Sequence, residues 1–529
     1  MAKNKYGTPV KRIIIGVLML LNILGFVGLY FWGLGWIVLL VFSIPLTIVS
    51  FVHISQKSHT ILKNFPLVGI LRYFFESIRP ELRQYFWESD TDGVPFNRRQ
   101  RSIVYQRSKN ELQTVAFGMQ QDPNVPGYEW VSHSAFPVSI TEKDLRITVG
   151  NEQCSHPYSL SILNISAMSY GALSKTAISA LNEGAALGGF AHNTGEGGIS
   201  DYHLLGGDLI WQIGTGYFGC RTEDGRFSPE LFAKNSSVPE VKMIELKLSQ
   251  GAKPGHGGIL PANKNTPEIA AIRHVEPGTT VASPPGHSAF KDSEGMIEFV
   301  ATLRKLSNGK PVGFKLCLGD KEEFLDICEA MYNTKIYPDF IAIDGAEGGT
   351  GAAPLEFTDN IGMPLYEALA FAHQALVKFG LRDKLKIIVS GKVITSFDIM
   401  KMIALGADAC YSARGMMFSL GCIQALVCNK DTCPAGVATQ NPNLYKGLDV
   451  NKKKVRVAQL HNNTIAATIE MMEACGFRNV KDIVPGKFHR RIDSIHSMNF
   501  QEIYFAQDDA AIIKRWNKII NQPKLEPVA

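Results

Sequence analysis

The chain has 529 residues and a formal net charge of +5, room for two to four ordinary domains or one large barrel with extensions. A charge this small, with no dense basic run, argues against a nucleic-acid partner. Nine cysteines in a chain of this length do not indicate a disulfide scaffold.

The first element is strongly apolar. Residues 13–54 contain no Asp, Glu, Lys or Arg, and this run is about twice as long as one membrane-spanning helix requires. Gly33 and Gly35, which lie among aromatic residues, offer a turn near its middle. We therefore predict a transmembrane hairpin with helices over 13–31 and 36–54.

Positive charge flanks this hairpin on both sides. The N-terminal tail, residues 1–12, is basic, and Lys57 and Lys63 follow the second helix. Because basic residues favour the cytoplasmic side, we expect an anchor in the inner (cytoplasmic) membrane and a catalytic domain that faces the cytoplasm. The run is too long for a signal peptide, and a buried hairpin of a soluble protein is the remaining alternative.

Residues 55–154 mix arginine-rich and aromatic stretches, which we interpret as a cap or linker of short helices and loops. Short apolar runs then alternate with helical ones over residues 155–445, which predicts an α/β fold, a (β/α)8 TIM-type barrel. The expected strands are 161–165, 241–247, 280–283, 312–317, 340–344, 386–390 and 409–412. The expected helices are 293–306, 321–333, 363–379 and 395–405.

An open doubly wound sheet is the competing fold for this region. No G-x-G-x-x-G motif opens a helix after the first strand, which disfavours that sheet. The remaining residues, 446–529, are rich in Lys and Arg and are expected to form a helical C-terminal tail.

Glycine-rich loops follow several expected strands, at 193–198, 251–258 and 344–351. Active sites of barrels lie on such loops, and glycine lets backbone amides approach a ligand closely. The loops after the last two strands contain Gly391 and Arg414, and barrels commonly bind phosphate there. This pattern predicts a large, flat, anionic ligand such as FMN, unless the glycines serve only tight turns.

Four long motifs then come in a fixed order within 155–445. They are KLSQGAKPGHGG at 247–258, SPPGH at 283–287, GAEGGTGAAP at 345–354 and C-x5-C-x4-C-P at 422–434. In this order they resemble the FMN-binding synthase domain of glutamate synthases. The resemblance implies a barrel-bound FMN beside a [3Fe–4S] cluster.

The cluster ligands that the resemblance implies are Cys422, Cys428 and Cys433, and thiolates are the usual ligands of iron–sulfur clusters. A loop of free thiols is one alternative, and a four-iron cluster with Cys410 or Cys220 as fourth ligand is another. A zinc site would need a fourth Cys or His at finger-like spacing, which is absent.

The resemblance also implies roles for individual residues. The residues expected to hold the flavin are Met168, Ser169, Lys315, Gly349, Gly391, Arg414 and Gly415. Lys247, Lys253 and Arg273 are expected to bind the carboxylates of 2-oxoglutarate, since a dicarboxylate requires cations. Glu196 would orient an ammonium or imine nitrogen, or simply accept hydrogen bonds from loop amides.

We therefore expect a membrane-anchored oxidoreductase acting on CH–NH2 donors, which converts 2-oxoglutarate or a related 2-oxo acid to glutamate. We find no glutaminase domain, C-terminal β-helix domain or dinucleotide-binding module in the sequence. Nitrogen is thus expected from ammonia, an amine or a separate subunit. Electrons are expected from an external donor such as ferredoxin or a reductase subunit, through the cluster to FMN and then to an imine.

Two other functions stay open. An FMN-dependent oxidoreductase of 2-hydroxy acids, coupled to a membrane quinone, would need a histidine base, for which His256, His274 and His287 are the candidates. A non-catalytic role is the other, in which the barrel binds flavin while the hairpin organises a partner complex.

Overall fold

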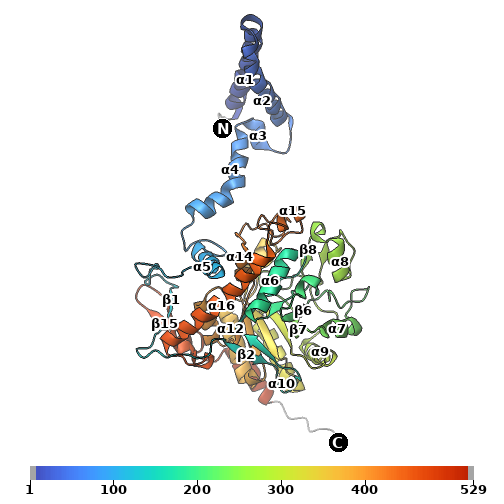
Figure 1. The fold of residues 1–529 in the computed structure, drawn as a ribbon, viewed down its shortest axis with the longest axis vertical. Helices are drawn as coiled ribbons and strands as arrows, with labels where there is room; N and C mark the ends of the chain where they lie inside the picture. Colours follow the sequence, from blue (N-terminus) through green and yellow to red (C-terminus); the bar gives the residue numbers. More distant parts are fainter. Residues whose placement is uncertain (1–6, 522–529) are drawn as a thin grey trace. The chain divides into compact units, whose positions relative to one another are not determined.

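A computed structural model describes residues 7–521 of the chain. They fall into two compact units, which meet in the sequence between Arg98 and Arg99. The first unit is helical, and the second contains a barrel (Figure 1).

The first unit begins with two apolar helices, α1 (Gly7–Trp32) and α2 (Ile37–Ser55), which pack against each other as a hairpin. The 3-10 turn η1 (Leu34–Trp36) joins them, and Gly33 reverses the chain at φ 94°, which glycine tolerates. The helices supply stretches of 23 and 22 residues with a mean hydropathy of 2.5, long and apolar enough to cross a membrane. The predicted hairpin is present, and its two helices are candidate membrane spans.

Polar side chains join the two helices of the hairpin. Asn22 Nδ2 donates a hydrogen bond to Thr47 Oγ1 at 2.8 Å, and Ser43 Oγ donates to Asn22 Oδ1 at 2.7 Å. Many large apolar side chains of both helices are exposed, which is typical of a hairpin that faces lipid. The first unit continues with α3 (Thr60–Asn64), α4 (Gly69–Leu82) and the π-helical turn η2 (Arg83–Trp87).

Eight parallel strands form a closed barrel in the second unit. In barrel order they are β4 (Leu163–Ile165), β5 (His192–Asn193), β6 (Leu209–Ile213), β7 (Val241–Lys247), β10 (Val312–Cys317), β11 (Phe340–Asp344), β12 (Lys386–Ser390) and β13 (Ala409–Ser412). Strands such as β10 and β11 are buried over their whole length, because helices cover the outside of a parallel barrel. The closed barrel confirms the predicted fold and excludes the open doubly wound sheet.

Helices follow most of the strands. They are α6 (Lys175–Gly188), α7 (Pro229–Ser236), α9 (Ser293–Leu306), α10 (Lys321–Thr334), α12 (Leu365–Lys378), α13 (Ser396–Ala404) and α14 (Arg414–Leu420). The four predicted helices agree with α9, α10, α12 and α13 to within two residues at each end. After β5 there is only the 3-10 turn η3 (Asp201–His203), and α11 (Leu355–Asn360) precedes α12.

One predicted strand, at 280–283, is not part of the barrel. It forms β9 (Val281–Ala282), which pairs antiparallel with β8 (Ile259–Leu260) in the long excursion between β7 and β10. The same excursion contains η4 (Ala262–Lys264) and α8 (Pro267–Arg273). The apolar run at 280–283 was compatible with a strand, but such a run does not specify the strand's partner.

A hairpin closes the amino-terminal end of the barrel. It consists of β2 (Arg146–Val149) and β3 (Tyr158–Ser161), which pair antiparallel immediately before β4. Val149 and Leu160 are fully buried and belong to the same core cluster as Ala342 of β11. Residues 146–154, expected in the cap or linker, are therefore part of the barrel unit.

The C-terminal region also differs from the expected helical tail at 446–529. Helix α16 (Val450–Cys475) packs along α6, α13 and α14, so it belongs to the barrel wall. Strands β14 (Phe488–Arg491) and β15 (Ser497–Asn499) form a three-stranded antiparallel sheet with β1 (Glu129–Val131). The other helices outside the barrel are α5 (Arg98–Lys109), α15 (Pro442–Tyr445), α17 (Phe500–Tyr504) and α18 (Ala510–Ile520).

Candidate active site

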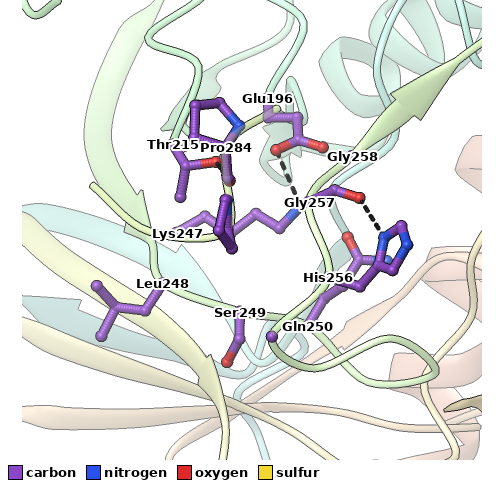
Figure 2. A pocket seen from close by; sticks show the side chains of 12 residues that line it. Glu196, Thr215, Lys247, Leu248, Ser249, Gln250, His256, Gly257, Gly258 and Pro284 are labelled. Carbon is purple, nitrogen blue, oxygen red and sulfur yellow. Dashed lines mark hydrogen bonds and ion pairs between the residues drawn. The ribbon is translucent and has the colours of Figure 1, made fainter. Parts of the chain in front are cut away.

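The glycine-rich loops meet at the carboxyl ends of the barrel strands. Lys247 is the last residue of β7, and its Nζ lies 3.0 Å from Oε2 of Glu196, which follows β5. Figure 2 shows the Lys247 side chain extended toward this carboxylate between the loops that carry Thr215, Gly258 and Pro284. They enclose a cavity of about 20 Å³, comparable to the space of a single water molecule.

Glycine is required beside Glu196 because the loops approach it closely. A Cβ atom at Gly214 or Gly258 would collide with the Glu196 carboxylate, and one at Gly257 would collide with the backbone of Ser283. Loops from three parts of the chain can therefore converge on one carboxylate.

Three cations act on this carboxylate. Burial alone would raise the pKa of Glu196, but Lys247, Lys253 and Arg273 hold it below its usual value. Burial and the charge of Lys247 lower the pKa of Lys253 to about 8, although Glu196 opposes the shift. Burial likewise lowers the pKa of Arg273 to about 10. The structure thus brings all four predicted substrate residues into one electrostatic group.

Arg273, the last residue of α8, reaches the loop after β4. Its Nη2 donates hydrogen bonds to Ser169 Oγ at 3.3 Å and to the Tyr170 carbonyl at 3.0 Å, and its guanidinium lies 5.2 Å from the ring centroid of Phe218. Its Nε is buried and has no hydrogen-bond partner among residues 7–521. A buried donor without a partner is typical of a site that binds a ligand.

The residues predicted to hold flavin lie along the carboxyl ends of β10 to β13 and on the loop after β4. Lys315 on β10 lies 3.5 Å from Asp344 at the end of β11, which also accepts from Ser390 Oγ at 2.6 Å. Arg414 begins α14, after β13, and donates to the Glu347 carbonyl at 2.7 Å. Burial lowers the pKa of Arg414 to about 10.

Steric constraints require glycine at three positions of this region. A Cβ atom at Gly349 would lie 2.9 Å from Arg414 Nε, and Gly391 has a φ of 151° that side chains rarely adopt. A Cβ atom at position 415 would collide with the Ser412 hydroxyl. Because β12 and β13 are the seventh and eighth strands, Gly391 and Arg414 lie where barrels commonly bind phosphate. Buried cations and tight glycine backbone together fit a flat, phosphorylated ligand such as FMN.

The cysteine loop follows α14. Cys422, Cys428 and Cys433 are free thiols, and burial raises the pKa of Cys422 to about 12 and that of Cys428 above its usual value. Between residues 7 and 521 no three side chains of His, Cys, Asp or Glu are placed to hold a metal ion. The donor type fits an iron–sulfur cluster, and the cluster itself stays a prediction. Cys220 and Cys410 are also free thiols, and both are fully buried.

A lysine that sequence reasoning missed connects the cysteine loop to the active-site loops. Lys264 is only 2% exposed, and its Nζ donates to the carbonyls of Ala172 at 3.0 Å, Cys428 at 3.0 Å and Ala438 at 2.9 Å. These carbonyls belong to the loop after β4, to the cysteine loop and to the segment that follows it. The sequence around Lys264 does not indicate this role, because its hydrogen-bond partners are backbone atoms.

A second missed feature is a buried carboxylate inside the barrel. Glu245 on β7 accepts hydrogen bonds from Asn193 Nδ2 at 2.9 Å, Gln212 Nε2 at 2.7 Å and the Tyr411 hydroxyl at 3.1 Å. Because side chains alternate along a strand, Glu245 points inward one layer below Lys247. The only acidic residue of this strand, which is buried over almost its whole length, was the signal that could have revealed it.

Of the three candidate histidines, His256 lines the cavity, His287 is hydrogen-bonded through both ring nitrogens, and His274 lies elsewhere. His287 Nε2 lies 2.8 Å from the Lys247 carbonyl, so this nitrogen must donate, and Nδ1 then accepts from the Tyr217 hydroxyl at 3.0 Å. His256 Nδ1 contacts the Gly257 carbonyl at 3.0 Å, and His274 ends α8 beside a separate surface groove. No nitrogen of His287 is therefore left to act as the base of a 2-hydroxy acid oxidoreductase.

Comparison with known proteins agrees with this geometry. The conserved region in glutamate synthase matches residues 131–478. The glutamate synthase large subunit-like protein YerD of Bacillus subtilis is 40% identical over 462 residues, which cover 79% of this chain and 87% of that protein.

Other relatives are longer than the matched region. An archaeal glutamate synthase (NADPH) of Methanocaldococcus jannaschii is 35% identical over 321 residues, 60% of each chain. The glutamate synthase (NADPH) large chain of Bacillus subtilis is 33% identical over 339 residues, which are 63% of this chain but 21% of that protein. The chain belongs to the glutamate synthase family, whose members are oxidoreductases that act on CH–NH2 donors.

Proposed function

We propose that this chain catalyses the reductive amination of 2-oxoglutarate, or of a related 2-oxo acid, to glutamate at the carboxyl end of its barrel. Ammonia or an amine supplies the nitrogen. A ferredoxin-like protein or a separate reductase subunit supplies the electrons.

An excess of buried positive charge around Glu196 carries this proposal. Lys247, Lys253 and Arg273 are buried, and the carboxylate of Glu196 compensates one of their three charges. Buried charges require partners, and a dicarboxylate such as 2-oxoglutarate brings two negative charges. The Glu196 oxygens are then available to accept an N–H from the ammonium or imine nitrogen.

The flavin and the cluster extend the proposal. Lys315, Gly349, Gly391, Arg414 and Gly415, with Met168 and Ser169 on the loop after β4, are the residues that would hold FMN. Cys422, Cys428 and Cys433 would hold a [3Fe–4S] cluster, since three thiolates suit a cube that lacks one iron. When bound, FMN supplies hydride transfer and the cluster supplies one-electron transfer. The protein's own residues bind the 2-oxo acid, neutralise its carboxylates and orient the nitrogen.

The hairpin of α1 and α2 is proposed to anchor the chain in the cytoplasmic membrane, with both ends in the cytoplasm. The hydropathy of the two helices and the basic residues Lys57 and Lys63 after α2 support this orientation. The catalytic unit then faces the cytoplasm, where ammonia and a soluble donor are available to it.

The first experiment is anaerobic purification of the full chain in detergent. We expect a flavin absorbance band and, after air oxidation, the low-temperature electron paramagnetic resonance signal of a [3Fe–4S] cluster. Cys428→Ser should abolish the signal, while Cys475→Ser, which changes a buried cysteine of α16, should retain it. Assays with 2-oxoglutarate, ammonia and reduced ferredoxin then measure glutamate formation.

The possible results separate the parts of the proposal. Flavin without iron would contradict the electron path through the cysteine loop. A chain with neither flavin nor iron would contradict the enzymatic function altogether. Lys247→Met should retain flavin and lose glutamate formation, and unchanged turnover in that variant would remove Lys247 from the substrate site.

A further inference from the structure

Helix α4 exposes a continuous apolar face. Ile70, Leu71, Phe74 and Phe75 are 43%, 54%, 51% and 56% exposed, and their spacing of one, three and four residues places them on one side of the helix. Ile78 and Leu82 continue the same side and are half-buried. Water-soluble helices normally bury such a stripe, so a surface of this kind marks an interaction site.

Exposed aromatic side chains follow α4 along the chain. The turn η2 follows α4 directly, and Tyr85, Phe86 and Trp87 within it are all exposed. Tyrosine and tryptophan are enriched where an apolar medium meets water, because their rings are apolar and their N–H or O–H groups need polar partners.

The opposite face of α4 is charged. Arg72, Glu76 and Arg79 are exposed there. Over residues 56–87 the chain carries five basic side chains, Lys57, Lys63, Arg72, Arg79 and Arg83, against two acidic ones, Glu76 and Glu81. This excess of positive charge beside an apolar face complements a surface that is apolar inside and anionic outside, which describes an anionic lipid bilayer.

We propose that α4 and η2 lie in the headgroup layer of the membrane, with the apolar face toward the acyl chains and the arginines toward lipid phosphates. The proposal rests on the membrane anchoring proposed above for α1 and α2. Thirteen residues, 56–68, separate the end of α2 from the start of α4. Even fully extended they span at most about 45 Å, so α4 stays close to the bilayer that holds the hairpin.

The role differs from that of the hairpin. Two spanning helices hold the chain in the membrane, but they do not by themselves place α4 at the membrane surface. An interfacial helix adds a second, lipid-sensitive contact, since arginine side chains reach phosphates while their stems cover apolar surface. Attachment of the segment 69–87 is therefore expected to depend on anionic lipid.

Site-specific photocrosslinking in the full chain tests this directly. p-Benzoylphenylalanine is placed at Phe74, on the apolar face, or at Glu76, on the charged face, and the chain is reconstituted in nanodiscs of phosphatidylglycerol or phosphatidylcholine. We expect a phospholipid adduct at position 74 that is several-fold stronger than at position 76, and weaker in phosphatidylcholine. Equal yields at both positions, or crosslinks from position 74 to a second copy, to another protein or to this chain's own barrel unit, would overturn the proposal.

Carbonate extraction of the same membranes distinguishes failure of the hairpin anchor from failure of the interfacial helix. If the chain is extracted, the anchoring hairpin itself has failed. If the chain stays in the pellet while position 74 forms no lipid adduct, anchoring stands and the interfacial helix is disproved.

A substitution pair provides a second measurement. The double variant Phe74→Ser/Phe75→Ser should stay in the membrane through the hairpin, but trypsin should cleave after Arg83 several-fold faster than in the unaltered chain. Tyr73→Phe, which changes an adjacent aromatic residue outside the apolar stripe and keeps its ring contact with His59, is the control and should cleave at the original rate. Because Phe74 and Phe75 are exposed, the double change leaves the packing of the fold intact. Unchanged cleavage in the double variant would count against a lipid contact.

Discussion

Lys253 carries a charge that depends on pH near neutrality. Since burial and Lys247 lower its pKa to about 8, the ammonium is present below that pH and is lost above it. If it binds a substrate carboxylate, the KM for 2-oxoglutarate should be flat below pH about 8 and rise about tenfold per pH unit above it. Steady-state kinetics across this range provide the measurement.

Lys253→Arg is the control for this titration, because arginine keeps its charge in the same range. Its KM should stay flat above pH 8, and an identical rise would assign the titration to another group.

The same pKa shift of Lys253 has the opposite effect on folding stability, which rises with pH. The folded chain disfavours the ammonium, so the destabilisation is full below pH about 8 and disappears as the pH rises toward the ordinary value of 10.5.

Lys264 makes a second residue-scale prediction. Lys264→Met leaves three buried carbonyls without their charged donor and should lower the free energy of unfolding by about 3 kcal/mol. Lys310→Met is the matched control, because Lys310 Nζ also donates to three carbonyls, those of Ser236, Val238 and Val241, elsewhere in the fold. Trypsin should cleave after the exposed Lys430 faster in the first variant alone. Equal cleavage in both would mean that Lys264 does not secure the cysteine loop.

A site residue could be predicted from the sequence only where it lies in a recognisable motif or makes side-chain contacts. Glu196, Lys247, Lys253 and Arg273 lie within or near recognisable motifs, and the structure places all four in one electrostatic group. Their assignment as substrate residues stays a prediction. Lys264 bonds only to backbone carbonyls, which carry no side-chain signature in a sequence.

At the scale of elements, Glu129 joins β1 to β14 and to the barrel wall. Its carboxylate accepts from Arg490 Nη2 at 2.7 Å and from Lys401 Nζ at 2.7 Å. Glu129→Gln removes one of the two carboxylates beside the buried Lys401, whose Nζ also lies 3.3 Å from Asp398, and should destabilise the fold by about 2 kcal/mol, as measured by thermal unfolding in detergent. Lys401→Met in the same chain should recover part of that loss. Simple additivity of the two changes would contradict the pairing.

The strands show which element types the sequence could reveal. Short, mainly apolar runs predicted β7, β10, β11, β12 and β13 at their observed bounds. The two-residue strand β5 is too short to form a pattern, and β6 contains a glutamine that points into the barrel. Partners far away in the chain, as between β1 and β14, cannot be read from a local pattern.

For the whole molecule, the hairpin makes the decisive prediction. Ile23 and Ile48 are exposed apolar residues in the middle of α1 and α2. Ile23→Arg/Ile48→Arg would place two charges in the bilayer core, at about 3 kcal/mol each on insertion scales, so carbonate should extract much more of the chain. Leu34→Arg, in the turn η1, is the control and should remain in the membrane pellet. A double variant that stays in the pellet would argue that the hairpin does not span.

The barrel and the hairpin were predictable at this scale because each repeats one simple pattern many times. The position at which the chain divides into its two units could not be predicted from the sequence. The expected boundary at residue 154 cuts the β2–β3 hairpin, because a strand pair that caps a barrel resembles a linker until its partner strand is known.

The packing of α16 on α6 has a consequence for synthesis at the ribosome. The chain emerges from its N-terminus, so α1 and α2 are complete while the rest is still being translated. All eight barrel strands are complete by Ser412, but the helix that covers α6 ends only at Cys475 and the partners of β1 come later still. Until then the nascent barrel carries an uncovered apolar wall. Pausing of translation between these two points would leave the intermediate most prone to aggregation.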